Sequence, residues 1–358
     1  MKNRHSDYMN WAKLHSKARY NLATSGVGAF PLRELGVTID QLEINGDSTY
    51  GYAPLQEAIA KKCEVSPDSV VAAAGTSMAN HLAMAALLEP GDEVLMEHPT
   101  YELLVSTARY FGADVKSFAR LESERYALNP ATVRKAVSAK TKLIVITNLH
   151  NPSSVLAPDA TLREVGDIAS SIGAHVLVDE VYLDAVYENT PRTSFHLGPE
   201  FIVTNSLTKV YGLSGLRCGW IFAEPELAER MWRLNDLFGV NQPHQSEMLS
   251  CFALDRLDEI AAGNSQRLAT NRAIFNDFVN SRSDVDCMAA RHGITVFPRW
   301  LGGDSDRLHD LLRTKYDTSV VPGRWFELPD RFRIGLGGDT AMLQEGLARI
   351  CEAMDQLK

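Results

Sequence analysis

Four polar side chains of different chemistry each follow a short apolar run in this sequence. They are an amide, a carboxylate, a phenol and an amine: Asn151, Asp179, Tyr182 and Lys209. If the runs are neighbouring parallel strands, their carboxyl ends meet at one rim, where open α/β sheets bind ligands. Singly, each residue also has a structural interpretation, such as a helix cap for Asp179 or a solvated surface amine for Lys209. Their joint occurrence calls for a common explanation.

One cofactor, pyridoxal phosphate (PLP), requires this combination of groups. PLP needs an amine that forms a Schiff base and an anionic partner that keeps its pyridine nitrogen protonated. Lys209 supplies the amine and Asp179 the anion, while Asn151 and Tyr182 can donate hydrogen bonds to the phenolic oxygen. The sequence therefore predicts PLP chemistry, in which the protonated ring stabilises a carbanion.

A candidate phosphate-binding turn precedes these residues in the chain. Gly75-Thr76-Ser77 follows an apolar run and opens a helix-like segment, and a helix N-terminus presents unpaired N–H groups to an anion. The same three residues would also make an ordinary helix start. Ser206 and Arg217 flank Lys209, and the glycines between them permit a tight loop that returns the guanidinium to the phosphate.

The elements that must position these groups are visible in the hydrophobic pattern. From about residue 50 to 237, short apolar runs alternate with amphipathic stretches. Strands buried on both faces read as continuous apolar runs, and this alternation implies a mostly parallel sheet covered by helices. Strands are expected at 69–73, 93–96, 143–147, 175–179, 201–205 and 218–223, and helices at 77–88, 100–111, 159–172 and 226–237.

The pattern changes after about residue 240. Long helical stretches cover residues 245–279, followed by strand-like and helical segments at 293–297, 306–315, 331–336 and 340–356. We therefore predict an α/β fold: a mostly parallel sheet sandwiched by helices, forming a large PLP-binding domain at 41–240, with a second, smaller α/β domain at 241–358. Residues 1–40 show no clear periodicity and are expected to pack with the small domain.

Composition narrows the class of protein. The 358 residues include 36 basic and 45 acidic ones, a net charge of −9, which argues against a general nucleic-acid or acidic-membrane binder. Five scattered cysteines without a Cys-x-x-Cys pair fit reduced thiols, and no residues have the spacing of a metal-ligand set. The start lacks the apolar stretch of a signal peptide, and no apolar run is long enough to span a membrane. A cytoplasmic location is expected.

The segment Ser206-Leu207-Thr208-Lys209 with Gly215-Leu216-Arg217-Cys218-Gly219-Trp220 resembles the lysine signature of class I/II aminotransferases, the fold type I PLP enzymes. Nearly the whole chain shares the resemblance, because other family-like segments follow in the family's order: Tyr50-Gly51-Tyr52, Gly75-Thr76-Ser77, Pro99-Thr100-Tyr101, Asn148 to Pro152, Asp179 to Tyr182 and Arg331-Phe332-Arg333-Ile334. Two departures stand out. Ser153-Ser154 replaces the usual Thr-Gly, and the loop at residues 26–30 lacks the usual Pro and Asp.

The resemblance implies a role for each matching residue. Lys209 would form the Schiff base and move the proton of the substrate Cα, assisted by Asp179 at the pyridinium and by Tyr182. The remaining cofactor contacts would come from Asn151 at the phenolic oxygen, Tyr101 on the ring, and Gly75, Thr76, Ser77, Ser206 and Arg217 at the phosphate.

Three further implications concern the substrate and a second subunit. Arg333 would bind the substrate α-carboxylate, assisted by Asn151 and by the backbone near Gly26. Tyr50 would reach the phosphate of the neighbouring subunit, which implies a homodimer with shared active sites. No nucleic acid or membrane is expected as a partner.

The predicted activity is that of a PLP-dependent aminotransferase, which moves an amino group between an L-amino acid and a 2-oxo acid in ping-pong half-reactions. The alternatives within the same fold are a β- or γ-lyase, a racemase or a cyclising synthase, because all share the cofactor site. A PLP-binding regulator without turnover is a further alternative, which the acidic charge disfavours. A dicarboxylate substrate would need a second cation, for which Arg299 and Arg324 are the candidates.

Overall fold

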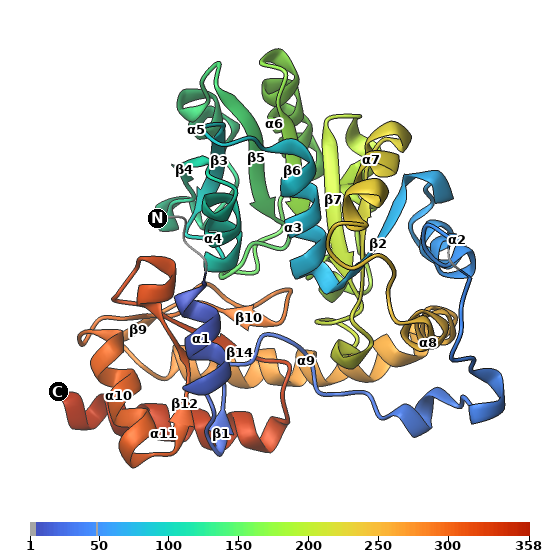
Figure 1. Ribbon diagram of the computed structural model, residues 1–358. Helices are drawn as coiled ribbons and strands as arrows, with labels where there is room; N and C mark the ends of the chain where they lie inside the picture. Colours follow the sequence, from blue (N-terminus) through green and yellow to red (C-terminus); the bar gives the residue numbers. More distant parts are fainter. Residues whose placement is uncertain (1–4, 48) are drawn as a thin grey trace.

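A seven-stranded sheet, in the order β2-β8-β7-β6-β5-β3-β4, forms the centre of the molecule (Figure 1). The computed structural model describes residues 5–47 and 49–358. β8 runs antiparallel to β7 and β2, and the other neighbouring pairs are parallel, which confirms the mostly parallel sheet. The strands are β2 (Val70–Ala74), β3 (Glu93–His98), β4 (Asp114–Ala119), β5 (Thr141–Thr147), β6 (His175–Asp179), β7 (Phe201–Ser206) and β8 (Cys218–Phe222).

Helices cover both faces of this sheet because its inner strands are apolar on both sides. In β5, Leu143 and Val145 belong to one core cluster, and Ile144 and Ile146 belong to the other, as the alternation of side chains along a strand requires. One face packs against α3 (Gly75–Leu87), α4 (Glu102–Tyr110) and α7 (Pro225–Asn235). The other packs against α2 (Ala53–Cys63), α5 (Pro130–Ala136), α6 (Asp159–Ser171), α8 (His244–Leu254) and α9 (Leu257–Asn280).

The edge strand β4 was not predicted from the sequence. Of its six residues only Phe118 is buried, because the strand pairs with β3 alone and leaves its other edge open. A strand in this position needs no continuous apolar run, and polar side chains protect an open edge from pairing with other chains. Its sequence therefore lacks the signal by which the inner strands were recognised.

The second, smaller α/β unit lies beyond the carboxyl ends of the parallel strands. Figure 1 shows its orange and red elements below the main sheet, with α1 and β1 in blue among them. Its strands and helices are β9 (Val285–Asp286), β10 (Thr295–Val296), β11 (Arg299–Trp300), β12 (Thr318–Ser319), β13 (Val321–Pro322), β14 (Phe332–Gly335), α10 (Ser305–Lys315) and α11 (Thr340–Leu357). Helix α9 contributes residues to the core beside the main sheet and also packs on α11, so the boundary at residue 240 stays a prediction.

The N-terminal segment contains short elements that its sequence pattern did not reveal. Helix α1 (Asp7–Leu14) buries only Tyr8 and Trp11, and two buried side chains are too few to show a helical period. Strand β1 (Tyr20–Asn21) pairs in parallel with β12, and Trp11 packs edge-on against His309 of α10. The segment therefore lies beside β12 and α10.

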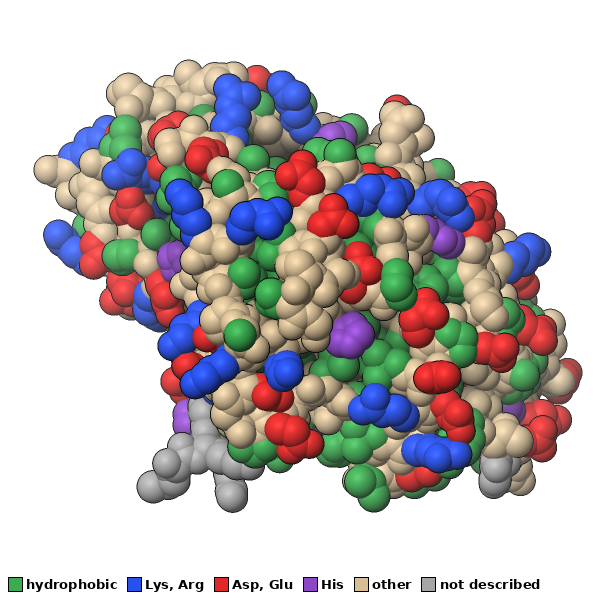
Figure 2. Space-filling view, turned by 90° about the horizontal axis from the view of Figure 1, so that it is seen from above, with side chains coloured by type: hydrophobic (Ala, Val, Ile, Leu, Met, Phe, Trp, Pro, Cys, Tyr) green, Lys and Arg blue, Asp and Glu red, His purple; other side chains and the backbone are tan. Residues whose placement is uncertain are grey.

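The surface agrees with the modest net charge. Figure 2 shows Lys and Arg side chains interspersed with Asp and Glu on the face seen from above, so the described residues there form no large patch of one sign. None of the helices in the described part of the chain is both long and apolar enough to cross a membrane.

Candidate active site

The carboxyl ends of β5, β6 and β7 bring the predicted site residues to one rim of the sheet. Thr147 of β5 stands opposite Asp179 of β6, which in turn stands opposite Thr204 of β7. Asn151 follows β5 and Lys209 follows β7 in the loops that leave this rim. Residues from segments that are distant in the sequence thus surround one space, as the parallel sheet predicts.

Asp179 is a buried carboxylate held by two hydrogen bonds. Asn80 Nδ2 donates to its Oδ2 over 2.8 Å, and the Val181 N–H donates to its Oδ1 over 3.1 Å. Thr204 Oγ1 donates to Asn80 Oδ1 over 2.7 Å, which fixes the orientation of that amide. Burial raises the pKa of Asp179 to about 6, although these bonds and the charge of Lys209 oppose the rise. The carboxylate is therefore suited to a cationic partner such as a protonated pyridine nitrogen.

Lys209 is an amine whose pKa is depressed. Burial lowers the pKa of Lys209 to about 8, and the positive charge of Arg333 contributes in the same direction. Its Nζ donates to Ser25 Oγ over 3.0 Å, and the Ser25 side chain also hydrogen-bonds Tyr182. A larger fraction of neutral amine near neutral pH makes Lys209 a better nucleophile toward a carbonyl and a better base.

The predicted phosphate cradle is assembled at the start of α3. Gly75 begins the helix with a φ of +75°, and a side-chain carbon at this position would clash with the Arg217 guanidinium, so only glycine fits. Arg217 Nη2 donates to the carbonyl of Ala74 over 2.8 Å, and Thr76 Oγ1 donates to Ser206 Oγ over 2.8 Å. The helix begins two residues earlier than the sequence pattern indicated.

This cradle also contains groups that lack partners. The Thr208 hydroxyl is buried and has no hydrogen-bond partner within the described chain, and the first N–H groups of a helix have no partner inside that helix. Ser77 adds an exposed hydroxyl in the first turn of α3. With the positive charge of Arg217 and the helix dipole, these donors fit a phosphate dianion.

Arg333 is a buried cation, and one of its three guanidinium nitrogens has no hydrogen-bond partner among the described residues. Its side chain is 1% exposed, and Nη1 donates to Asn151 Oδ1 over 3.0 Å while Nη2 donates to the Tyr8 hydroxyl over 3.1 Å. Its Nε has no partner, and among residues 5–47 and 49–358 no carboxylate forms an ion pair with it. Because a buried charge without a counter-ion is costly, this arrangement suits an anionic ligand group, such as a carboxylate.

The other predicted contacts occupy different surroundings. Tyr101 is half-buried beside Tyr8, with ring centroids 5.6 Å apart in an edge-to-face arrangement. Gly26 lies against Lys209, whose carbonyl accepts a hydrogen bond from the Val27 N–H over 2.9 Å. Tyr50 lies apart from the cluster: it is 52% exposed and its hydroxyl donates to Asp236 over 3.0 Å. Its predicted role across a subunit boundary stays a prediction.

Three residues of this site were missed by the sequence analysis: Tyr8, Ser25 and Asn80. Each contacts a predicted residue through a long-range hydrogen bond, to Arg333, Lys209 and Asp179 respectively. Asn80 stands on α3 one turn beyond the cradle, and Ser25 immediately precedes Gly26, but neither position carries a distinctive residue pattern. The only signals that could have indicated Ser25 and Asn80 were their polar side chains and their closeness in the sequence to predicted site residues.

Ser154 explains how the loop after Pro152 tolerates the absence of the usual glycine. Ser154 adopts a φ of +60°, which glycine favours, and its Oγ donates to the carbonyl of Thr295 in β10 over 2.7 Å. Gly293 leaves room for this hydroxyl, because a side chain there would clash with it. The serine therefore takes the glycine-like turn and also ties this loop to the smaller unit.

This arrangement predicts different outcomes for two substitutions at Ser154. Ser154→Ala keeps the unfavourable φ and loses the hydrogen bond, so it should destabilise the protein by about 1 kcal/mol. Ser154→Gly also loses the bond but removes a backbone penalty of about 1 kcal/mol, so its stability should stay close to that of the wild type. Thermal unfolding of both variants checks this, and a glycine variant as unstable as the alanine variant would contradict it.

Comparison with known proteins agrees with this geometry. Residues 40–350 match the family described as aminotransferase class I and II. The chain is 28% identical over 351 residues to capreomycidine synthase of Streptomyces vinaceus, which covers 94% of this chain and 90% of that protein. It is 26% identical over 326 residues to a probable aspartate/prephenate aminotransferase of Aquifex aeolicus, with 86% and 82% covered.

A solved structure resembles the chain over its full length. The crystal structure of a PLP-dependent aminotransferase from Streptococcus suis superposes with a TM-score of 0.93 at 25% sequence identity, covering 100% of this chain and 99% of that one. The fold, the cradle and the family match lead to the same conclusion. This chain belongs to the class I and II aminotransferase family of PLP-dependent, fold type I enzymes.

Proposed function

We propose that this protein is an aminotransferase that moves an amino group between an L-amino acid and a 2-oxo acid in two half-reactions. The observation that supports this most directly is Arg333, whose unpartnered Nε is buried in the same site as Lys209. A carboxylate bound by this guanidinium would place an amino acid beside the lysine amine. Relatives named as aminotransferases support the same reaction class.

Each residue has a definite task in this proposal. PLP, when bound, supplies the electron sink for a carbanion at the substrate Cα. Asp179 holds a negative charge beneath the site, and Lys209 takes and returns the Cα proton. Burial raises the pKa of Tyr182 to about 12, so its hydroxyl stays protonated at neutral pH and can donate a hydrogen bond. Asn151, in the loop after β5, is held by Thr147 at the end of that strand, and its side chain accepts a hydrogen bond from Arg333.

The first half-reaction tests this function without knowledge of the second substrate. A panel of L-amino acids is added singly to the PLP-loaded enzyme, and absorbance is followed together with released products. We expect conversion to pyridoxamine phosphate with one 2-oxo acid released per site. Ammonia release, or a changed amino acid with PLP retained, would instead assign a lyase, a racemase or a cyclising synthase.

A cyclising synthase is the second candidate, because the relative that covers 94% of this chain is named capreomycidine synthase. The cofactor residues described above serve either reaction.

The structure also gives information on the substrate side chain. Arg299 Nε pairs with Asp330 over 2.7 Å, and Arg324 pairs with Asp306. Each arginine already has a carboxylate partner, so neither gives direct support for a dicarboxylate substrate.

Replacing Arg333 should impair substrate binding rather than cofactor binding. Arg333→Leu removes charged hydrogen bonds worth about 1.5–3 kcal/mol each, so the apparent KM for the amino donor should rise by about 10- to 100-fold or more. Because the charge of Arg333 lowers the pKa of Lys209, the substitution should also move Schiff-base formation by added PLP to higher pH. Loss of PLP binding with an unchanged KM would reassign this residue.

Exposed apolar side chains indicate where a second subunit would bind. Ile39 and Ile44 are 83% and 82% exposed, and Leu237 is 78% exposed. The two segments that carry them adjoin the start of α8, where Gln245 Nε2 donates to the carbonyl of Ile44. We propose that this surface, together with Tyr50, which packs against Trp232 of α7, contacts a second copy of the chain, since apolar patches of this kind mark interaction sites.

Hybrid dimers test whether Tyr50 serves the partner's site. Tyr50→Ala should weaken PLP binding by about 10- to 100-fold through the lost bond to phosphate, and Lys209→Ala should prevent the covalent link. A hybrid of the two variants contains one site with Lys209 from one subunit and Tyr50 from the other, so tight covalent PLP binding should return on mixing. If mixing restores nothing, Tyr50 does not act across the interface. A monomer by sedimentation would contradict the dimer itself.

A further inference from the structure

A buried polar chain connects the interior of the sheet to the substrate arginine. Resting on the proposed function, we propose that Arg120, Glu97 and Thr147 are positioning residues that hold Asn151, and through it Arg333, for the substrate carboxylate. None of the three touches the substrate or the cofactor in this proposal. They act by fixing the backbone of the loop that carries Asn151.

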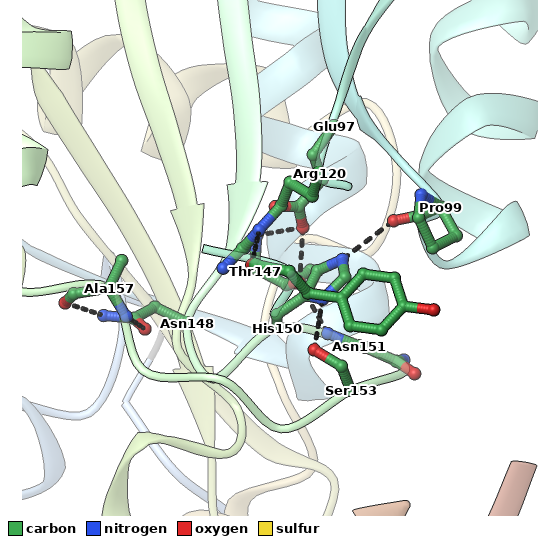
Figure 3. A network of polar contacts seen from close by, with 10 residues as sticks. Glu97, Pro99, Arg120, Thr147, Asn148, His150, Asn151, Ser153 and Ala157 are labelled. Carbon is green, nitrogen blue, oxygen red and sulfur yellow. Dashed lines mark hydrogen bonds and ion pairs between the residues drawn. The ribbon is translucent and has the colours of Figure 1, made fainter. Parts of the chain in front are cut away.

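The contacts of this chain are continuous, and Figure 3 shows the part from Arg120 through Glu97 and Thr147 to Asn151. Arg120 Nη1 donates to Glu97 Oε2 over 2.8 Å, and the N–H and Oγ1 of Thr147 both donate to Glu97 Oε1, over 2.7 and 2.6 Å. Thr147 Oγ1 in turn accepts from the Asn151 N–H over 2.8 Å. Asn151 Oδ1 then accepts from Arg333 Nη1 over 3.0 Å.

The direction of each hydrogen bond is determined by the chemistry of its groups. Because Thr147 Oγ1 donates its single proton to Glu97, it must act as an acceptor toward Asn151. Glu97 and Arg120 are 1% and 2% exposed, so water does not compete for these bonds. Both oxygens of the carboxylate are engaged, one by the guanidinium and one by Thr147. The hydroxyl of Thr147 therefore has one stable orientation, which suits it to holding the Asn151 backbone.

His150 makes two further hydrogen bonds that hold the loop of Asn151. Its Nε2 lies 2.8 Å from the carbonyl of Pro99, which can only accept, so Nε2 carries the proton and Nδ1 accepts from Ser153 Oγ over 2.6 Å. Burial lowers the pKa of His150 well below its usual value, in agreement with a neutral ring. His150 thereby joins the loop of Asn151 to the segment that leads into Tyr101.

A similar pair of residues, Thr141 and Glu93, lies at the other end of β5 and β3. It allows an effect on the position of Asn151 to be distinguished from a general loss of stability. Thr141 begins β5 and donates through its hydroxyl to Glu93 at the start of β3, while accepting from the Ser138 N–H over 2.9 Å. Thr141 is fully buried, as Thr147 nearly is. The two threonines thus make the same kind of bond between the same strands, but only Thr147 continues to the active site.

The test compares Thr147→Val, Thr147→Ser and Thr141→Val in the PLP-loaded enzyme. The probe is 2-methylalanine, whose Cα carries no hydrogen, so that its binding is read from the cofactor absorbance without any turnover. We expect Thr147→Val to raise the dissociation constant about tenfold, and Thr147→Ser and Thr141→Val to stay within about twofold of the wild type. Both valine variants should lower the melting temperature by similar amounts, and all three should still form the covalent link with PLP.

Several results would overturn this inference. They are an unchanged dissociation constant in Thr147→Val, an equal rise in Thr141→Val, or a failure of Thr147→Ser to restore binding. If Thr147→Val does not fold, Thr147→Ala removes the same hydroxyl and takes its place. The proposed function is judged separately. If none of the amino acids in the panel converts the wild type to its pyridoxamine phosphate form, the aminotransferase proposal fails. The binding comparison at Thr147 still stands in that case.

Discussion

Replacing Lys209 by alanine is expected to reduce turnover by a factor of about 10² to 10⁴, the range typical of a lost general acid–base group. The charge of Arg333 acts on this amine, and its pKa of about 8 leaves more neutral amine at neutral pH than an ordinary lysine has. PLP should remain bound through the phosphate cradle and Asp179, but without a covalent link. The first half-reaction, followed by absorbance after rapid mixing, measures this effect.

A second half-buried lysine provides the control. Lys62 forms an ion pair with Asp184 over 3.0 Å and belongs to none of the predicted site segments. Borohydride reduction of the PLP-loaded wild type should attach the cofactor to Lys209 alone, and Lys62→Ala should leave that adduct unchanged. An adduct at another lysine, or a Lys209→Ala variant that works at the wild-type rate, would show that the assignment is wrong.

The second large effect is expected for Asp179→Asn. An amide cannot neutralise a protonated pyridine nitrogen, and breaking a buried charge pair typically costs about 3–5 kcal/mol. If this loss falls on the carbanion-forming step, the rate constant should fall by a factor between about 10² and 10⁴. The neighbouring Glu180→Gln is the matched control, because Glu180 is equally buried but accepts its hydrogen bonds from Ser194.

Asp179 should also make the stabilisation of the folded protein by bound PLP depend on pH. Its pKa rises from 3.8 to about 6 in the folded chain, so the folded state holds this proton more firmly than the unfolded one. The stability that this group contributes is present below the unfolded pKa and is lost as pH rises through the folded value. A bound pyridinium should offset the loss, so PLP should raise the melting temperature more at pH 7.5 than at pH 5.

In the Asp179→Asn variant, the rise in melting temperature caused by PLP should differ less between pH 7.5 and pH 5. Melting curves with and without PLP at both pH values measure it, with Glu180→Gln as the comparison. The comparison is needed because burial also raises the pKa of Glu180, to about 7. A pH dependence that persists in Asp179→Asn and disappears in Glu180→Gln would show that Glu180, and not Asp179, is the group that titrates.

The cofactor side of the site was predictable because its signals are local in the chain. Asp179 ends a continuous apolar run, Lys209 follows another, and Gly75 stands where a strand turns into a helix. Each signal depends on the pattern of only a few neighbouring residues. Parallel pairing then places such strand ends at one rim. These local patterns, with the order of the family-like segments, were enough to indicate the fold and the cofactor, while the residues that would contact PLP stay predictions.

The residues that tune these groups could not be found in that way. Ser25 lies 184 positions from Lys209, Asn80 lies 99 from Asp179, and Tyr8 lies 325 from Arg333. Strand β4 likewise stayed hidden, because an edge strand has no need of an apolar run. The Thr147 hydroxyl becomes informative only when Glu97 and Asn151 are seen on either side of it.

Residue types and their spacing thus decided which chemistry this chain can perform and along which strands its groups are carried. Folding in three dimensions decided the pKa values of Asp179 and Lys209, the lack of a partner for Arg333 Nε among the described residues, and the hydrogen bonds that orient these groups. The physical reason is that apolar periodicity is a property of neighbouring residues. Desolvation and hydrogen bonding, in contrast, depend on every segment that happens to surround a group.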